Sequence, residues 1–276
     1  MLRTMLSATN TMSQLQGKMD TISHNISNSN TTGYKARSAT FGELMYQQFN
    51  NDKEDRTPRQ SPVGIRMGVG AQIAQTQLNN KVGGITQTNR KLDFALTKER
   101  QYFSFINENN GQLVLSRQGN FYLSPSANGG TDLVNSDGYH VADSNGKAIQ
   151  FSKDVSDFTI SPDGRLQVTF ADGTTGQQEL GVVQVDKPNL LEQDQDKYLR
   201  YSEDIASKYP NENNIVYQLT GQNRSQIEVQ GGALESSNVD LSKEMSELIN
   251  TQRSYQLNAR TITMADQMLG LINSVR

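Results

Sequence analysis

Apolar residues recur every three or four positions near the N-terminal end of the chain. The spacing alternates between three and four, which is the heptad pattern of a single apolar helix face. Polar residues that suit water fill the positions between them, so the pattern predicts a helix over residues 3–28. The residues of this N-terminal stripe are Met5, Ala8, Met12, Leu15, Met19, Ile22 and Ile26.

A second stripe of the same spacing lies at the C-terminal end, with Gln252 and Asp266 as two polar interruptions. It predicts one helix of about 35 residues, roughly 50 Å long. Ser237 and Asp240 precede it at the spacing of a capping box, which marks its start. The C-terminal stripe contains Leu241, Met245, Leu248, Gln252, Tyr255, Ala259, Ile262, Asp266 and Leu269, and Ile249, Met264, Met268 and Ile272 widen it.

The period changes to that of β-strands between about residues 65 and 230. Short runs rich in Phe, Tyr, Val and Leu alternate with dipeptides that favour tight hairpin turns. These dipeptides are Asn110-Gly111, Asp137-Gly138, Asn145-Gly146, Asp163-Gly164 and Asp172-Gly173. The middle of the chain is therefore predicted to be an antiparallel β domain, with exposed loops over 50–64 and 202–214.

Together these patterns predict an α+β fold in which the terminal helices pair as a coiled-coil-like unit around a central antiparallel β domain. We expect a helical domain of residues 1–30 and 236–276, an extended linking region of 31–85 and 221–235, and a β domain of 86–220.

Neither helix can bury its stripe alone, and an exposed apolar strip usually marks an interface. The candidate assembly interface is Met5, Met12, Leu15, Met19, Ile22 and Ile26 together with Leu241, Met245, Leu248, Tyr255, Ile262 and Leu269. The alternative is a monomer whose terminal helices lie on the β domain.

A polar segment, "SNSNTTGYK", follows directly on the N-terminal stripe. Asparagine and glycine can adopt the left-handed conformations that end a helix, and Ser and Thr hydroxyls bond nearby backbone groups. The segment therefore predicts a sharp exit from helix to extended chain. We take its motif residues to be Asn25, Asn28, Asn30, Thr32, Gly33, Tyr34 and Lys35.

The composition narrows the function classes. Among 276 residues there is no cysteine and no tryptophan, which excludes thiolate chemistry, disulfides and zinc sites of the cysteine type. The formal net charge of −3, with no long basic run, argues against nucleic acid as a partner. The N-terminus lacks the apolar run of a secretory signal, and no stretch is apolar and long enough to predict a membrane-spanning helix.

Candidate chemistry is sparse. The two histidines, His24 and His140, lack the companions of a metal site. "NSDG" at 135–138 and "DSNG" at 143–146 are better explained as turns than as calcium loops, because the first ligand position would hold an apolar residue. No hydrolase, zinc-protease or phosphate-loop motif is present. We therefore predict no catalytic residue, no metal and no cofactor.

The arrangement resembles a known family. "DTISHNISNSNTTGYKARSATFGELMYQ" is similar to the N-terminal signature of flagellar rod and hook proteins, and "GALESSNVDLSKEMSELINTQRSYQLNARTITMADQMLGLI" to their C-terminal signature. "GGITQTNRKLDFAL" and "SRQGNFYL" resemble their central elements. The likeness covers nearly the whole chain in order, and its length suits basal-body rod proteins of the FlgG/FlgF type. One departure is residues 97–103, "TKERQYF", where the family has a glycine-rich turn.

The resemblance implies a structural subunit of the flagellar rod. Such proteins are exported unfolded by the flagellar type III apparatus and polymerise outside the cytoplasmic membrane, with the terminal helices lining the tube core. The implied partners are other copies of the chain, neighbouring rod and hook subunits, and the export apparatus. Two alternatives are a secreted all-β carbohydrate-active or adhesive protein with helical oligomerisation ends, and a cytosolic coiled-coil adaptor.

Overall fold

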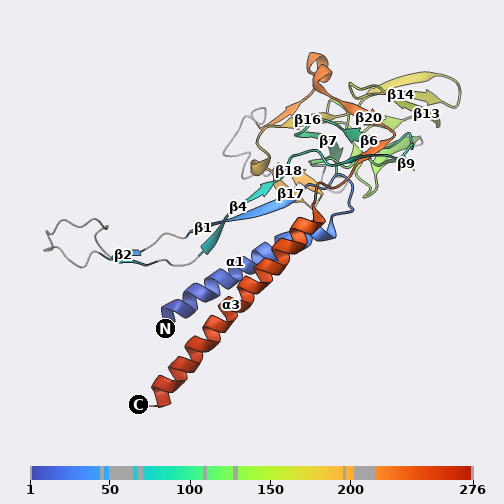
Figure 1. Cartoon of the computed structure of the whole chain (residues 1–276). Coiled ribbons are helices and arrows are strands. Elements are labelled where there is room, and N and C mark those ends of the chain that lie inside the picture. Colours follow the sequence, from blue (N-terminus) through green and yellow to red (C-terminus); the bar gives the residue numbers. More distant parts are fainter. Residues whose placement is uncertain are drawn as a thin grey trace. The chain divides into compact units, whose positions relative to one another are not determined.

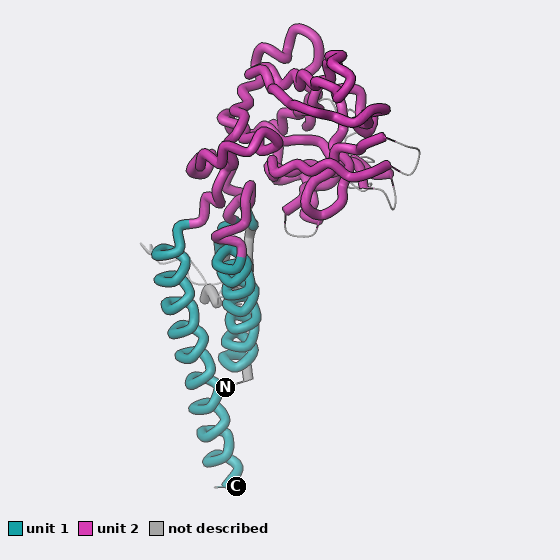
Figure 2. The backbone as a smooth tube through the Cα atoms, turned by 90° about the vertical axis from the view of Figure 1, so that its right-hand side faces the viewer, with its two compact units in different colours: residues 1–27, 37–77, 240–276 teal, residues 28–36, 78–239 magenta. Residues whose placement is uncertain are grey.

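The computed structural model describes residues 2–43, 47–49, 65–67, 71–107, 111–126, 130–194, 197–201 and 215–274. The loops predicted over 50–64 and 202–214 lie outside the described residues. The chain forms two compact units, coloured teal and magenta in Figure 2. The first, here the helical unit, comprises Met1–Ser27, Arg37–Gln77 and Asp240–Arg276, and the second, here the β unit, comprises Asn28–Ala36 and Leu78–Val239.

Two long helices, α1 (Leu2–Ser27) and α3 (Leu241–Ser274), pack side by side in the helical unit (Figure 1). They run antiparallel, and Lys18 Nζ lies 3.4 Å from Glu247 Oε2 across the pair. Ala8, Leu15 and Ile22 of α1 are buried, as the heptad spacing requires. The predicted pairing of terminal helices in an α+β fold is therefore confirmed.

Helix α3 begins one residue after Asp240. The Asp240 carboxylate accepts hydrogen bonds from the backbone N–H groups of Ser242 (3.0 Å) and Lys243 (3.1 Å), which makes Asp240 the N-terminal cap. Ser237, the other half of the expected capping box, instead accepts a bond from the N–H of Val239 at 3.4 Å. The helix therefore starts three residues later than a cap at Ser237 would place it.

The side of α3 that packs against α1 differs in part from the C-terminal stripe. Leu248, Tyr255, Ile262 and Leu269 are half-buried, but Thr251 and Ala265 are buried between them, where the stripe had Gln252 and Asp266. Alanine is small, and the Thr251 hydroxyl is satisfied by donating to Glu247 O at 2.7 Å, so both residues tolerate close helix packing. Leu241 and Met245 are 47% and 44% exposed and lie off this contact.

The helical unit also contains paired strands. Strand β1 (Arg37–Glu43) pairs with β4 (Ala71–Leu78), and β2 (Gln47–Phe49) pairs with β3 (Ile65–Met67).

A ten-stranded sheet forms the centre of the β unit. Its strands follow the order β12-β10-β11-β7-β8-β18-β17, while β16 pairs with β7 and β19, and β9 pairs with β10. The strands are β7 (Gln101–Ile106), β8 (Leu113–Ser116), β9 (Phe121–Pro125), β10 (Thr131–Asn135), β11 (His140–Val141), β12 (Gln150–Phe151), β16 (Val182–Val185), β17 (Glu192–Asp194), β18 (Tyr198–Arg200) and β19 (Val216–Gln218). They pair antiparallel, as the strand pattern predicts.

Smaller sheets complete the β unit. They are the three-stranded sheet of β13 (Val155–Ile160), β14 (Arg165–Phe170) and β15 (Thr175–Glu179), the pair β5 (Ile85–Gln87) with β21 (Ala233–Glu235), and the pair β6 (Phe94–Leu96) with β20 (Val229–Gly231). Short 3-10 helices occupy Pro188–Leu190 (η1) and Gly221–Gln226 (η3). All five of the predicted turn glycines adopt positive φ angles: Gly111, Gly138, Gly146, Gly164 and Gly173.

The core of the β unit follows from the alternation of side chains along the central strands. Phe103 and Phe105 of β7 point to one face, where their rings pack 5.4 and 5.9 Å from that of Phe121. Tyr102 points to the other face and joins a smaller apolar cluster with Leu115 and Val183. Both faces of β7 are thus buried, which explains why apolar side chains occur on both sides of the strand.

The segment in which the chain departs from the family pattern contains a strained residue. Arg100 adopts φ +60°, a conformation that L-residues other than glycine rarely take. Its carbonyl accepts a hydrogen bond from the N–H of Val185 at 2.9 Å, which holds the backbone in this shape. The turn therefore survives without glycine, at a cost in backbone strain.

Candidate functional site: the helix-exit junction

The segment Asn28–Ala36, here the exit segment, leaves α1 in two tight turns. The N–H of Thr31 donates to Asn28 O at 3.2 Å, and the N–H of Tyr34 donates to Thr31 O at 3.3 Å. Asn28, Asn30 and Gly33 are the residues expected to suit left-handed conformations, and of these Gly33 adopts one, with φ +73°. Asn28 contributes through its side chain, whose Oδ1 accepts the Thr31 hydroxyl at 3.1 Å.

Gly33 is required by space as well as by conformation. A Cβ atom at this position would lie 2.5 Å from the carbonyl carbon of Arg117, well inside van der Waals contact. The N–H of Gly33 donates to Glu235 O at 2.8 Å. The sharp exit predicted from the sequence therefore serves to bring the backbone directly against two other segments of the β unit.

A buried cluster of three charged side chains, here the junction cluster, lies at this meeting point. Glu235 of β21 accepts hydrogen bonds from Lys35 Nζ (2.5 Å) and the N–H of Gly83 (2.8 Å) at Oε1, and from Arg117 Nε (2.6 Å) at Oε2. The Glu235 and Arg117 side chains are fully buried, and that of Lys35 is 4% exposed. Charges at such depth are tolerated only with well-aligned partners, and each has them here.

Arg117 is held by the backbone as well as by Glu235. Its Nη1 donates to Lys98 O and Gln101 O, both at 2.8 Å, and its Nη2 donates to Leu96 O at 2.7 Å. The planar guanidinium fork makes these bonds simultaneously. Arg117 thereby ties the end of β8 to the strands β6 and β7 and presents Nε to Glu235.

This arrangement disfavours the charged form of Lys35. Burial lowers its pKa to about 8, and the nearby positive charge of Arg117 acts in the same direction. The carboxylates of Glu235 and, more weakly, Glu99 raise the pKa but do not offset these two effects. Two cations and one buried carboxylate leave the cluster with an excess positive charge, so Lys35 loses its proton at a lower pH than an exposed lysine does, although at pH 7 it still carries the proton.

Asn238 connects the exit segment to the C-terminal signature through hydrogen bonds to backbone groups. Its Oδ1 accepts from the N–H of Ala36 at 2.7 Å, and its Nδ2 donates to Asn79 O and Lys81 O, both at 2.9 Å. Lys35 Nζ also donates to Lys81 O at 2.6 Å. Three segments far apart in sequence are therefore joined by two side chains.

The base of the exit segment is closed by Asn25 inside the helical unit. Asn25 is fully buried, donates from Nδ2 to Arg37 O at 2.7 Å, and accepts at Oδ1 from the N–H of Arg37 at 3.0 Å. One amide side chain thus satisfies both polar groups of a backbone residue, as a neighbouring strand would. Asn25 also forms a hydrogen bond with Glu244 of α3. Burial raises the pKa of Glu244, although this hydrogen bond acts to lower it.

The predicted motif residues therefore divide between two places. Asn25 acts in the helical unit, Gly33, Tyr34 and Lys35 are buried in the β unit, and Asn30 is exposed. Periodicity and motif spacing do not single out Arg117, Glu235 or Asn238, although all three lie in segments that resemble the family signatures. A charged residue inside an otherwise apolar run, as in "LVLSRQG" and "GGALESS", was the available signal.

The residues of the candidate assembly interface lie on both sides of the helix pair. On α1, Leu15 and Ile22 are buried against α3, and Met5, Met12, Met19 and Ile26 are half-buried. On α3, Leu248, Tyr255, Ile262 and Leu269 are half-buried, whereas Leu241 and Met245 are exposed. The structure of a single chain explains the buried members as a helix-pairing seam, and their role in assembly stays a prediction.

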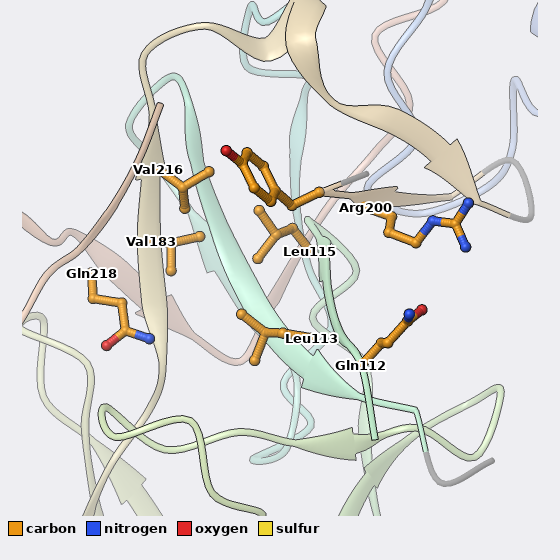
Figure 3. A pocket seen from close by; sticks show the side chains of 8 residues that line it. Gln112, Leu113, Leu115, Val183, Arg200, Val216 and Gln218 are labelled. Carbon is orange, nitrogen blue, oxygen red and sulfur yellow. The ribbon is translucent and has the colours of Figure 1, made fainter. Parts of the chain in front are cut away.

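A cavity of about 390 Å³ opens on the smaller apolar cluster of the β unit (Figure 3). Its wall is apolar, from Leu113, Leu115, Val183 and Val216, with Gln112, Gln218 and Arg200 among the polar lining groups. Among the described residues that line it there is no carboxylate, so this part of the lining offers no acid pair of the kind used in glycoside hydrolysis. Arg200 is paired with Glu192 Oε2 at 3.2 Å.

The described part of the chain offers neither a metal-binding cluster nor a membrane-spanning helix. His24 is exposed and His140 is half-buried. Within the residues that the structure describes, no group of three or more His, Cys, Asp or Glu side chains could hold a metal ion. Neither α1 nor α3, over its described length, is long and apolar enough to cross a bilayer.

Comparison with known proteins gives matches along the chain. Residues 5–35 match the model of the flagella basal body rod protein family, residues 100–168 match the flagellar hook protein FlgE/F/G D1 domain, and residues 230–275 match the C-terminal domain of flagellar basal body rod FlgEFG proteins. The junction cluster takes one charged residue from each of these three regions.

Full-length relatives agree. The chain is 44% identical to the flagellar hook-basal body complex protein FlhP of Bacillus subtilis over 100% of both chains. It is 31% identical to the flagellar basal-body rod protein FlgG of the same organism, over 98% of this chain and 97% of the relative. It is 29% identical to FlgG of Borreliella burgdorferi over 100% and 99%. The chain therefore belongs to the family of flagellar basal-body rod and hook proteins.

Proposed function

We propose that this protein is a structural subunit of the flagellar rod that polymerises through its terminal helices after export by the flagellar type III apparatus. Its place is then the basal body, outside the cytoplasmic membrane. Its partners are further copies of itself and the adjoining rod or hook subunits. The protein carries load and catalyses no reaction, in keeping with its relatives in the hook–basal body complex.

The observation that carries this proposal is the outer side of α3. Leu257, Met264, Met268 and Leu271 are between 45% and 67% exposed. Their spacing of seven, four and three residues places them on one helix face, nearly opposite the side that packs against α1. A helix that is apolar on both sides is typical of a position with neighbours all round.

A variant of the outer face, here the outer-face variant, tests this surface without disturbing helix pairing. Met264→Asp with Met268→Asp places two carboxylates on the outer side of α3, where burial between subunits would cost several kcal/mol each. Gln256→Asp with Gln267→Asp is the matched control, since it adds the same charge at exposed polar positions of the same helix. Both variants would be expressed in a strain that lacks the wild-type gene.

We expect the outer-face variant to keep the helical circular dichroism signal of the wild-type protein, while its incorporation into purified basal bodies and cell motility are lost. The control should retain both. If the outer-face variant assembles as well as the control, polymerisation through the outer face of α3 is excluded. If it accumulates inside the cell, export rather than assembly is the affected step, which fractionation of the two variants separates.

A further inference from the structure

The path of the chain between the two units has an unusual feature. It leaves the helical unit after Ser27, spends the nine residues of the exit segment in the β unit, and returns to the helical unit at Arg37. The base of this excursion is closed by Asn25 and Arg37 within the helical unit. Its tip is held by Gly33, Lys35 and Ala36 within the β unit.

We propose that the exit segment is a detachable coupling, whose tip can leave the β unit while both units stay folded. It would then act as a conformational device in the chain between α1 and β1. The proposal concerns the single chain and does not depend on the polymerisation argued above.

The partners of the tip remain satisfied when it leaves. Glu235 keeps its hydrogen bonds from Arg117 Nε and the Gly83 N–H, and Arg117 keeps its three carbonyl acceptors. The groups that lose a bond are Glu235 O, Glu235 Oε1, Lys81 O, the Asn238 Oδ1 and the Asn79 N–H, which water can satisfy once the segment is gone. No charge is left buried and unpaired in the β unit.

The tip itself is held by little apolar surface. Of its nine residues, Tyr34 and Ala36 are the buried apolar side chains, and the other two buried residues, Gly33 and Lys35, form hydrogen bonds and one ion pair. Segments with few buried apolar contacts open locally at free energies well below that of global unfolding. By contrast, Ser104 and Ala142 lie in the central sheet, where their N–H groups bond to Gly181 O (3.0 Å) and Ser104 O (2.9 Å).

Native-state hydrogen exchange on the full chain tests the proposal. The reporter amides are Gly33, Ala36 and Asn79, whose bonds form only when the tip is docked. In the wild-type protein they should exchange faster than the amides of Ser104 and Ala142, and with a weaker dependence on low concentrations of urea. Equal exchange free energies and equal urea dependence in the two groups would overturn the proposal.

Tyr34→Ala sharpens the test by removing the main apolar contact of the tip. We expect exchange at Gly33, Ala36 and Asn79 to accelerate at least about 30-fold, and exchange at Ser104 and Ala142 by less than about threefold. Tyr122→Ala, at a tyrosine that is 42% exposed, is the control and should change neither group. If Tyr34→Ala accelerates both groups in proportion, or unfolds the chain, the exit segment is an integral part of the β core.

Discussion

Glu235→Gln removes the only negative charge of the junction cluster and keeps the shape of the side chain. A glutamine at this position can accept through Oε1 from Lys35 and Gly83, but its amide Nε2 then faces the Arg117 Nε–H, and two donors cannot bond to each other. Turning the amide moves the conflict to Lys35 and Gly83. Either way a buried donor loses its acceptor.

The loss of stability has two contributions. Losing the charge-assisted bond of Arg117 costs roughly 1.5–3 kcal/mol. Lys35 avoids facing Arg117 without a counter-charge by releasing its proton, and because its pKa is about 8, this costs at most about 1.4 kcal/mol at pH 7. We therefore expect the free energy of unfolding of the β unit to fall by about 3–4 kcal/mol at pH 7.

Urea unfolding followed by near-ultraviolet circular dichroism of the tyrosines is a suitable assay, because most of the described tyrosines lie in the β unit. Glu192→Gln, which breaks an exposed pair with Arg200, is the control and should change the unfolding free energy by less than about 1 kcal/mol. In a Lys35→Met background the loss caused by Glu235→Gln should shrink by about 1.4 kcal/mol. A loss below about 1 kcal/mol at pH 7, or no difference between the two backgrounds, would refute this account of the cluster.

Three further predictions concern single groups. The folded pKa of Lys35, about 8, lies below its unfolded value of 10.5, so the unfolded chain binds more protons between these values and stability rises with pH. From pH 7.5 to 9.5 the wild-type protein should gain about 2 kcal/mol relative to Lys35→Met in urea unfolding, and a loss would show the sign to be wrong. Arg100→Val should lower the free energy of unfolding by about 1–2 kcal/mol because a β-branched residue resists φ +60°, whereas Arg100→Gly should not; equal melting temperatures for the two would contradict this. Asn25→Ala removes the two hydrogen bonds that Asn25 makes to the backbone of Arg37 and should destabilise the helical unit by about 2–3 kcal/mol in urea unfolding followed at the helical band, and an unchanged midpoint would remove Asn25 from this role.

Much of the fold can be predicted from the sequence because its signals are local. The heptad spacing of Ala8, Leu15 and Ile22 identifies both the helix and the side that it buries, since 3.6 residues per turn brings these positions together. The glycines of "SDG" and "PDG" mark hairpin turns because few other residues adopt positive φ. The family signatures act in the same way, as short ordered motifs that need no long-range information.

The C-terminal stripe shows the limit of periodicity. Apolar residues on α3 occur on more than one side. Spacing alone is therefore compatible with a buried face that contains Gln252 and Asp266 as well as with the observed buried face, which contains Thr251 and Ala265. The surface of α1 selects between these two faces, because it requires small or internally hydrogen-bonded residues at the points of closest approach. That information lies in another part of the chain.

The junction cluster depends wholly on the tertiary structure. The sequence by itself determined that Gly33 would permit a sharp turn and that Lys35 would follow it, because backbone freedom is a property of the residue. It could not reveal that Lys35 and Glu235, 200 residues apart, share a hydrogen bond with Arg117 at the other oxygen. Nor could it reveal that Asn28–Ala36 belongs to a different compact unit from the helix before it. The pKa of a lysine and the cost of a buried charge are set by neighbours in space, and only the folded chain brings those neighbours together.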